Sequence, residues 1–362
     1  MSLRGIKDQA VPIRLLQNML KRDRVPNGLL FWGPCGVGKR MTAMEFAKAI
    51  NCPEREDDAC DGCLSCRKVS NGNHPDVKVV APVKRARVIG VDTVETVNEL
   101  ASLRAFDSQW RVFILLEAER MHPAAQNVFL KTLEEPPGRS LFILVTEHPR
   151  MLLPTIRSRC QLMRFSSLRP ETVAVILERD RGLDVELAQA IAALSQGQVS
   201  RAFDLVDTDK REVLLDIIRR LDDGEDPLAL AEAFTKHLTA RRDEIEALIK
   251  AEEEDMALDE LSRDDREEMR EQEKARIDAE YRYESMEYLY LFETWYRDAA
   301  VYGALGDASR LFNRDQTDRL AGSGQVDLAE KVAAIEKARL YLERFIKEER
   351  VFRDLFFALA GQ

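Results

Sequence analysis

The sequence has no apolar run of the roughly 20 residues that a membrane-spanning helix needs. Its apolar fraction of 45% is ordinary for a globular protein. The stretch from Met1 to Gln9 also lacks an apolar segment of signal-peptide length. We therefore expect a cytoplasmic protein without a membrane partner. In that reducing compartment, clustered cysteines favour a metal site over disulfides.

Positive charge is outnumbered by negative charge. Lys and Arg number 54 against 64 Asp and Glu, which gives a net charge of -10. Binding to a nucleic-acid backbone depends on cationic side chains that displace counterions, so this balance argues against a free-standing DNA-binding protein. One short basic cluster, Lys84, Arg85 and Arg87, precedes a predicted helix. It is more typical of a solvated loop than of a phosphate contact.

Short β-rich runs alternate with helical patterns in the first part of the chain. The runs lie at 29–32, 77–80, 112–116, 141–146 and 162–165. Such alternation predicts a parallel sheet covered by helices. Helices are expected between the runs, including one over 42–50 and one over 91–102 with Asp92 as its cap.

After Phe165 the strand signals stop and helical spacing continues to the end of the chain. At 362 residues, two or three domains are expected. The predicted fold class is α/β plus all-α, with a parallel-sheet core over 1–165, a small helical lid over 166–207 and an all-helical domain over 208–362. The last is expected to hold helices at 212–220, 227–248, 283–302 and 328–359. Residues 251–279 are dominated by charged side chains and predict a solvated helical or partly disordered insertion.

A phosphate-binding loop follows the first predicted strand. Residues 33–40 read Gly-Pro-Cys-Gly-Val-Gly-Lys-Arg, which fits Gly-x4-Gly-Lys between a strand and a helix. Glycines at Gly33, Gly36 and Gly38 let backbone N–H groups close around phosphate, and Lys39 can neutralise the β and γ oxygens. ATP or ADP is therefore the expected ligand.

Both supports for magnesium are altered. The eighth loop position normally carries Ser or Thr, and here it is Arg40, which cannot ligate a cation. The third strand should end in an acidic pair, yet the sequence reads Leu116-Glu117, so Glu117 is vestigial without a metal-side carboxylate. Pairing Glu117 with Glu119 is disfavoured because Ala118 separates them, and a solvated loop accounts for Glu119. We predict phosphate binding without hydrolysis.

Four cysteines follow the pattern C-x7-C-x2-C-x2-C: Cys52, Cys60, Cys63 and Cys66. Two overlapping C-x2-C steps bring sulfurs together on tight turns, and the fourth thiolate completes a tetrahedral zinc site. Four protein ligands leave no open position, so the zinc would be structural. Redox-active thiols are the alternative, but redox chemistry needs only two of the four. Cys35 and Cys160 stand apart.

Several stretches resemble the clamp-loader branch of AAA+ proteins and, within it, the δ′-subunit family of bacterial DNA polymerase III. They are the string Asn-Val-Phe-Leu-Lys-Thr-Leu-Glu-Glu-Pro-Pro at 127–137, Ser158-Arg159-Cys160, the cysteine module and residues 89–94. The likeness runs over about residues 9 to 205 and continues more weakly at 293–298 and 311–315. It implies a RecA-like AAA+ core with a zinc module inserted at 52–66, a lid and a helical collar.

The resemblance also implies roles for arginines. In this family, the arginine of Ser-Arg-Cys reaches the ATP of a neighbouring subunit, which assigns Arg159, flanked by Ser158 and Cys160, as an arginine finger acting in trans. Arg157 is the nearest competitor for this role. Arg201 lies in a segment similar to the lid motif that carries a nucleotide-sensing arginine. A lid-surface arginine is the equally weighted alternative for Arg201.

The function implied by this resemblance is assembly. The chain would be a non-hydrolysing, stator-type subunit, a non-catalytic part of a DNA polymerase III holoenzyme. Its partners would be the motor subunits and the δ subunit, with the sliding clamp and primer-template DNA reached through the assembly. Collar association would bury the region of Trp295, unless that tryptophan belongs to the core. The alternatives are an active ATPase motor subunit of the same loader and a zinc-dependent nucleic-acid-binding module.

Overall fold

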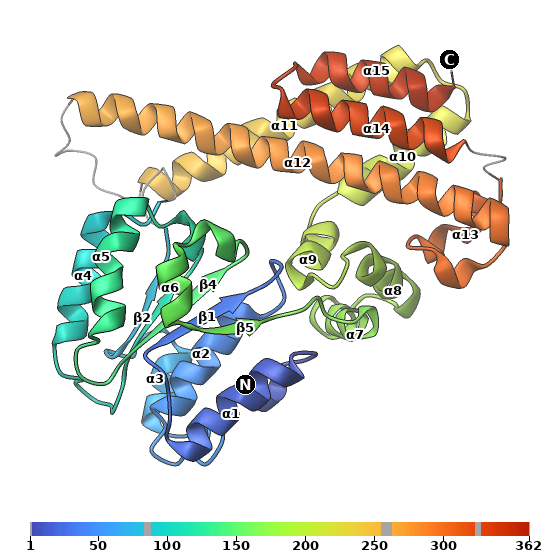
Figure 1. The fold of residues 1–362 in the computed structure, drawn as a ribbon. Coiled ribbons are helices and arrows are strands. Elements are labelled where there is room, and N and C mark those ends of the chain that lie inside the picture. The colour runs from blue at the N-terminus through green and yellow to red at the C-terminus, as the bar shows by residue number, and fades with distance from the viewer. Residues whose placement is uncertain (1, 83–87, 255–262, 323–326, 362) are drawn as a thin grey trace. The chain divides into compact units, whose positions relative to one another are not determined.

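The computed structural model describes residues 2–82, 88–254, 263–322 and 327–361. The basic cluster of Lys84, Arg85 and Arg87 lies outside them. The chain divides into two compact units, which Figure 1 traces by residue number. The first unit is Met1–Thr172 with Gly197–Ser200, and the second is Val173–Gln196 with Arg201–Gln362. The boundary expected at residue 208 between lid and collar stays a prediction.

The first unit is built on a sheet of five parallel strands in the order β2-β3-β4-β1-β5. The strands are β1 Gly28–Trp32, β2 Val77–Val80, β3 Arg111–Leu115, β4 Ser140–Thr146 and β5 Gln161–Arg164. Each lies within one residue of a predicted run, so the predicted parallel sheet is confirmed. Strand β1 lies between β4 and β5, and its side chains at 29–31 are fully buried. Burial on both faces explains its uninterrupted apolar sequence.

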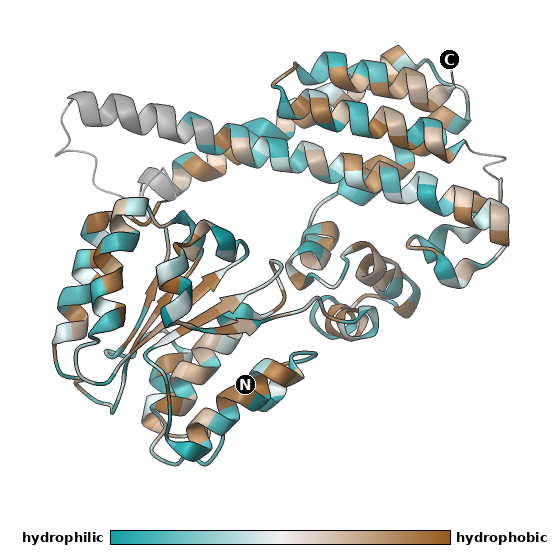
Figure 2. Ribbon diagram, viewed as in Figure 1, coloured by the Kyte–Doolittle hydropathy of each residue, from teal (hydrophilic) through white to brown (hydrophobic). Residues whose placement is uncertain are grey.

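Helices cover both faces of this sheet (Figure 1). They are α1 Ala10–Arg22, α2 Lys39–Ile50, α3 Leu64–Ser70, α4 Val91–Ser102, α5 Pro123–Glu134 and α6 Pro154–Arg159. The strands between these two helical layers are mostly apolar (Figure 2). On the face covered by α4, α5 and α6, Phe142 stacks on Phe113 at 5.4 Å and meets the edge of Phe129 at 5.3 Å. These rings join β3 and β4 to α5.

The start of α4 differs from the prediction. Gly90 is the N-cap residue and offers no side-chain hydrogen bond, whereas Asp92 lies inside the first turn. A carboxylate at that position interacts favourably with the positive end of the helix dipole, but it does not cap the helix. The expected role of Asp92 as the cap is therefore wrong.

The remaining elements are helices, and no helix among the described residues is long and apolar enough to cross a membrane. They are α7 Pro170–Arg181, α8 Val185–Leu194, α9 Val199–Asp207, α10 Lys210–Asp222, α11 Pro227–Glu254, α12 Arg263–Leu305, α13 Thr317–Gly322, α14 Leu328–Glu343 and α15 Glu348–Ala360. Most side chains of the predicted insertion at 251–279 lie outside the described residues.

One helix expected at 328–359 is in fact two. Helix α14 ends at Glu343 and α15 begins at Glu348, and between them Phe345 has a left-handed backbone with φ of 59°. Apolar spacing continues through the break, which is why the sequence pattern did not reveal it.

The second unit packs around Phe234, whose ring meets Tyr288 at 5.0 Å and Phe352 at 4.8 Å. Trp295 is 2% exposed and belongs to this core.

A buried carboxylate anchors the segment that follows α12. Asp298 is 0% exposed and accepts hydrogen bonds from the backbone N–H groups of Phe312 and Asn313 at 2.9 and 2.7 Å. The Asn313 side-chain amide donates to the same carboxylate at 3.0 Å. Nearby, Asp315 accepts from Arg211 at 2.7 Å. The two stretches at 293–298 and 311–315 are thus joined by buried polar contacts.

Replacing this carboxylate tests the anchor. Asp298→Ala should lower the free energy of unfolding by about 3 kcal/mol or more, because it leaves several buried N–H donors without an acceptor. Asp354→Ala is the control, since Asp354 is half exposed and 3.9 Å from Arg353, and it should change stability by less than about 0.5 kcal/mol. Urea unfolding followed by circular dichroism measures both. Equal effects of the two substitutions would contradict the anchoring role.

Candidate functional site

The predicted phosphate loop connects β1 to α2. A Cβ on Gly33 would lie 2.2 Å from the carbonyl oxygen of Phe165, and a Cβ on Gly36 would lie 2.2 Å from Oγ of Ser200. Both glycines also have positive φ values, of 144° and 66°. Only glycine fits at these two positions. The loop is further held by the Val199 N–H, which donates to the Gly36 carbonyl at 3.1 Å.

Lys39 is the first residue of α2 and is 7% exposed. Its ammonium donates to the carbonyl oxygens of Gly33 and Pro34, each at 2.5 Å. Burial lowers the pKa of Lys39, while the nearby Glu147, Cys35 and Glu119 oppose that shift. The Lys39 ammonium therefore binds carbonyls of its own loop, and the carboxylates of Glu147 and Glu119 lie close enough to favour its charged form.

Glu119 is not the solvated loop residue that the sequence predicts. It lies in the short 3-10 helix η2 Ala118–Arg120, and its Oε1 accepts a hydrogen bond from the Glu147 N–H at 3.2 Å. Its Oε2 is buried with no hydrogen-bond partner. Glu119 and Glu147 are the site residues that sequence reasoning missed, because 28 positions separate them and no local pattern marks their meeting near Lys39.

The two positions predicted to lack magnesium ligands are Arg40, in the first turn of α2, and Leu116, directly after β3. Arg40 is exposed, and no hydrogen bond or ion pair to it occurs within the described part of the chain. Strand β3 ends at Leu115, so Leu116 and Glu117 follow it directly. Glu117 has a left-handed backbone and forms an ion pair with Arg120 at 2.6 Å. No carboxylate thus occupies the position of Leu116.

The predicted finger, Arg159, is the last residue of α6. It forms an ion pair with Glu134 of α5 and donates to the Thr155 carbonyl at 3.1 Å. Its side chain is 35% exposed, so this pairing stabilises the fold only weakly. Glu134 belongs to the Leu-Lys-Thr-Leu-Glu-Glu-Pro-Pro string. The ion pair therefore joins two of the stretches that carry the family resemblance.

The neighbours of Arg159 have different environments. The Ser158 hydroxyl donates to the Thr155 carbonyl at 3.0 Å. Cys160 is buried, and burial raises the pKa of its thiol to about 12, which makes it a core residue rather than a reactive one. Arg157 is half-buried, and its Nε has no hydrogen-bond partner.

Arg201 is held inside the second unit. Its guanidinium forms two hydrogen bonds with the carboxylate of Glu287, at 2.9 and 3.0 Å, and lies 3.7 Å from the ring centroid of Tyr290. The side chains of Arg201 and Glu287 are only 10% and 9% exposed. A guanidinium paired in this way is costly to release, because each partner would leave an unpaired buried charge.

The four predicted cysteines meet. Their sulfurs lie within 4.8 Å of one another, and no other such group of possible metal ligands occurs among the residues that the structure describes. The Cys52–Cys63 and Cys60–Cys66 sulfur distances are 4.0 and 3.9 Å. Zinc bound tetrahedrally to four thiolates at about 2.3 Å requires sulfurs about 3.8 Å apart. The four residues therefore fit a zinc ion.

Backbone groups also suit the thiolates. The N–H groups of Cys60, Cys63 and Cys66 point at the sulfurs of Cys52, Cys60 and Cys63, at 3.5, 3.3 and 3.4 Å. Such N–H donors stabilise the negative charge that metal binding requires. The site has the chemistry of a structural zinc centre.

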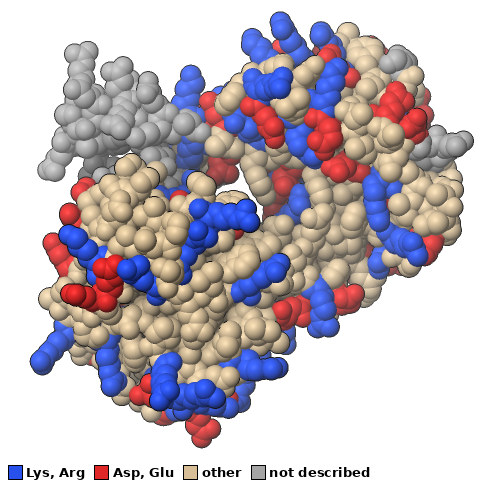
Figure 3. Space-filling model, viewed as in Figure 1, with Lys and Arg blue, Asp and Glu red and all other residues tan. Residues whose placement is uncertain are grey.

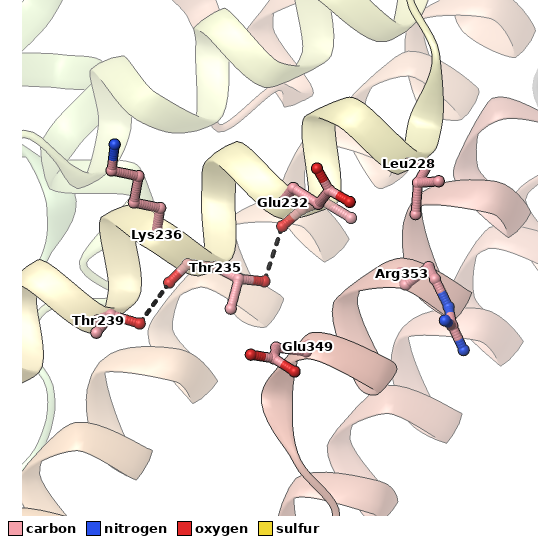
Figure 4. A pocket seen from close by; sticks show the side chains of 8 residues that line it. Leu228, Glu232, Thr235, Lys236, Thr239, Glu349 and Arg353 are labelled. Carbon is pink, nitrogen blue, oxygen red and sulfur yellow. Dashed lines mark hydrogen bonds between the residues drawn. The ribbon is translucent and has the colours of Figure 1, made fainter.

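A separate cavity of about 460 Å³ lies in the second unit between α11 and α15 (Figure 4). Its walls carry Glu232, Thr235, Lys236 and Thr239 of α11 and Glu349 and Arg353 of α15. The threonine hydroxyls are used within the helix: Thr235 donates to the Ala231 carbonyl and Thr239 to the Thr235 carbonyl. None of the predicted site residues lines this cavity.

Comparison with known proteins gives one family match. Residues 8–169 match the family described as DNA polymerase III, delta subunit. The chain is 30% identical to "DNA polymerase III subunit delta'" of Bacillus subtilis over 204 residues, which are 55% of this chain and 59% of that protein. It is 33% identical to "DNA polymerase III subunit tau" of Bacillus subtilis over 202 residues, which are 54% of this chain and 35% of that protein.

The chain thus spans about half the length of the curated relatives it matches, or less. Among solved structures, a DNA polymerase III gamma subunit-related protein of Thermotoga maritima is 18% identical with a TM-score of 0.38, covering 75% of this chain and 93% of that one. The expected resemblance to δ′ subunits is confirmed by the family match and the curated relatives.

Metal analysis tests the cysteine cluster. The purified chain should contain close to one zinc per molecule, and Cys63→Ser should weaken zinc binding by more than about 100-fold, since even outer partners of a metal site contribute 10- to 100-fold. Cys35→Ser is the control, because Cys35 is exposed and outside the cluster. A metal-free wild-type protein with four titratable thiols would contradict the zinc assignment.

A double-mutant cycle tests the Arg201 pair. Arg201→Ala and Glu287→Ala should each lower the free energy of unfolding by about 3 kcal/mol, with a coupling of roughly 2 kcal/mol between them. Arg339 and Glu293 form a matched control at 2.8 Å with side chains 29% and 36% exposed. Their coupling should stay below about 1 kcal/mol. Similar couplings in the two pairs would show that burial does not set the strength of the Arg201 contact.

Proposed function

We propose that this chain is a non-hydrolysing, stator-type subunit of a clamp loader, because residues 8–169 match the family described as DNA polymerase III, delta subunit. In this role it assembles with motor subunits and a δ subunit and helps place a sliding clamp on primer-template DNA. The relatives named delta' support the choice of subunit. The activity of the assembly and its partners are part of the proposal.

The observation that carries the non-hydrolysing role is the loss of both magnesium supports. Arg40 and Leu116 stand where a hydroxyl and a carboxylate would hold the ion, and neither can ligate it. Phosphoryl transfer depends on magnesium to neutralise charge that develops on the phosphate oxygens. Without it, the loop around Lys39 retains donors for phosphate but lacks the means to cleave it.

The arginine-finger role rests on the position and exposure of Arg159. Its side chain is 35% exposed and its carboxylate partner, Glu134, is 48% exposed. Such a pair exchanges readily with solvent, so the guanidinium can be transferred to a phosphate of a neighbouring subunit at little cost. Arg201 is the weaker candidate for nucleotide contact, because its pair with Glu287 is buried.

An active motor subunit is the second candidate. The match to the tau subunit and the complete loop from Gly33 to Lys39 favour it. The alternative of a zinc-dependent nucleic-acid-binding module has less support, since the chain has a net charge of -10 and Asp and Glu side chains lie among the Lys and Arg side chains in Figure 3.

Steady-state ATP hydrolysis distinguishes the non-hydrolysing subunit from the motor subunit. The purified chain alone should show no turnover, and adding it to the remaining loader subunits should stimulate theirs. Turnover by the chain alone that disappears in Lys39→Ala would instead identify a motor subunit.

Arg159→Ala tests the finger in the reconstituted loader. Single-turnover hydrolysis at the neighbouring site should fall by about 10³-fold, the lower end of arginine-finger contributions, while size-exclusion chromatography shows intact assembly. Arg150→Ala is the control, since Arg150 is an exposed arginine just before α6. Unchanged hydrolysis in Arg159→Ala would remove the finger role, and a loss in Arg157→Ala alone would transfer it to Arg157.

A further inference from the structure

The loop inside the cysteine module carries three aspartates that the zinc assignment does not use. This segment, the cysteine loop, spans residues 53–62 between Cys52 and Cys63, and it contains neither helix nor strand. Its aspartates are Asp57, Asp58 and Asp61. Because the loop has no regular structure of its own, its conformation depends on the cysteines and on the partners of these aspartates.

Two of these aspartates hold the start of the chain. The Asp58 carboxylate accepts hydrogen bonds from the backbone N–H groups of Leu3 and Arg4, at 3.1 and 3.0 Å. Asp57 pairs with the Arg4 guanidinium at 2.7 Å and with Lys21 of α1 at 3.2 Å. The Leu3 side chain is fully buried. The first residues of the chain are thus docked on the cysteine loop.

The N-terminal segment, residues 3–9, ends against the phosphate loop. Its last side chain, Gln9, is 2% exposed and exchanges two hydrogen bonds with the backbone of Ser166, at 2.7 and 3.1 Å. The same amide reaches the Val37 carbonyl of the phosphate loop at 3.5 Å. Ser166 directly follows the residue whose carbonyl lies against Gly33. Gln9 therefore binds both sides of the close approach that shapes the phosphate loop.

The third aspartate binds the helix that follows the phosphate loop. Asp61 directly follows Cys60, has a left-handed backbone with φ of 58°, and pairs with Lys48 of α2 at 2.5 Å. Lys48 is 1% exposed and also pairs with Glu45 of its own helix at 2.5 Å. Loss of a carboxylate partner is costly for a buried ammonium. The position of Asp61 therefore bears on α2, whose first residue is Lys39.

We propose that metal binding at the four cysteines positions the phosphate loop, through Gln9 on one side and Lys48 on the other. A metal ion would fix the cysteine loop and so hold its three aspartates where the N-terminal segment and α2 meet them. Without metal, the same contacts require the ordering of an irregular loop, which costs conformational entropy. Gln9 and Lys48 are positioning residues. The inference goes beyond the proposed function, because it holds for a non-hydrolysing subunit and for a motor subunit alike.

Hydrogen exchange measures the effect of the metal on the loop. Chelation of zinc from the full chain should speed exchange about 10-fold at two backbone N–H groups. One is that of Ser166, which donates to Gln9, and the other is that of Thr42, which donates to Gly38 at the start of α2. Exchange in the central strand β4 should stay slow, and adding zinc back should restore both amides. Unchanged exchange at Ser166 and Thr42 would overturn the proposal.

A zinc-loaded variant keeps the test decisive if chelation unfolds the first unit. Asp58→Ala retains all four cysteines and should speed exchange at Ser166 about 10-fold with zinc still bound. Glu56→Ala is the matched control, because Glu56 is an exposed acid of the same loop, and it should leave the exchange rate unchanged. Equal exchange rates in the two variants would contradict the route through the N-terminal segment.

The coupling also acts in reverse. A coupling free energy between two sites is reciprocal, so loosening the N-terminal segment or α2 should weaken zinc binding by a comparable factor. Competition with a chromophoric zinc chelator should show about 10-fold weaker binding in Gln9→Ala and in Lys48→Met. The controls are Gln161→Ala and Lys78→Met, which change exposed side chains of β5 and β2. Zinc affinity unchanged in both Gln9→Ala and Lys48→Met would overturn the coupling.

These measurements use no partner subunit. A failure of the coupling therefore leaves the proposed function standing, whereas ATP hydrolysis and the Arg159→Ala variant can overturn the proposed function without affecting the coupling. A wild-type chain that binds no zinc would overturn the coupling together with the metal assignment.

Discussion

The close approach of backbone at Gly33 and Gly36 is the constraint on which the first unit depends. At Gly33 the loop passes the carbonyl of Phe165 as the chain leaves β5, and at Gly36 it meets Ser200 at the start of α9. Any side chain at either glycine would displace the backbone that it meets. This contact places the loop over the end of β1, between β4 and β5, and directs α2 back along the sheet. The position of Lys39 follows from it.

The three cations that the motifs mark as candidate phosphate contacts have different partners. Lys39 donates to carbonyls of its own loop. Arg159 shares a partly exposed contact with Glu134, and Arg201 is buried against Glu287 and Tyr290. Since the cost of releasing a cation rises with the burial of its partner, the Arg159 pair opens at less cost than the Arg201 pair. The two arginines therefore differ in how deeply their ion pairs are buried, which the sequence motifs do not record.

The four cysteines of the cluster come from short turns and from the first turns of α3. A metal ion held by its four sulfurs would have no open coordination position. Asn51, which directly precedes Cys52, binds the backbone of Trp110, 59 positions away. Metal binding and local order are linked wherever ligands come from short turns, because the turns alone cannot hold the sulfurs together. Asn51 and Lys68 connect the segments beside the cluster to the residues between α4 and β3, through Trp110 and Asp107.

The sequence by itself determined the five strands, the glycine pattern at 33–38, the residues Arg40 and Leu116 at two positions of that motif, and the spacing of the four cysteines. Each depends on spacing between near neighbours, which local pattern records directly. Only the tertiary structure decided that Glu119 lies near Lys39, that Arg201 pairs with Glu287 across 86 positions, and that Asp76 holds the backbone of Phe106. It also decided the break at Phe345. These depend on burial and on contacts between residues distant in the chain, and no periodicity of one segment specifies which other segment it will meet.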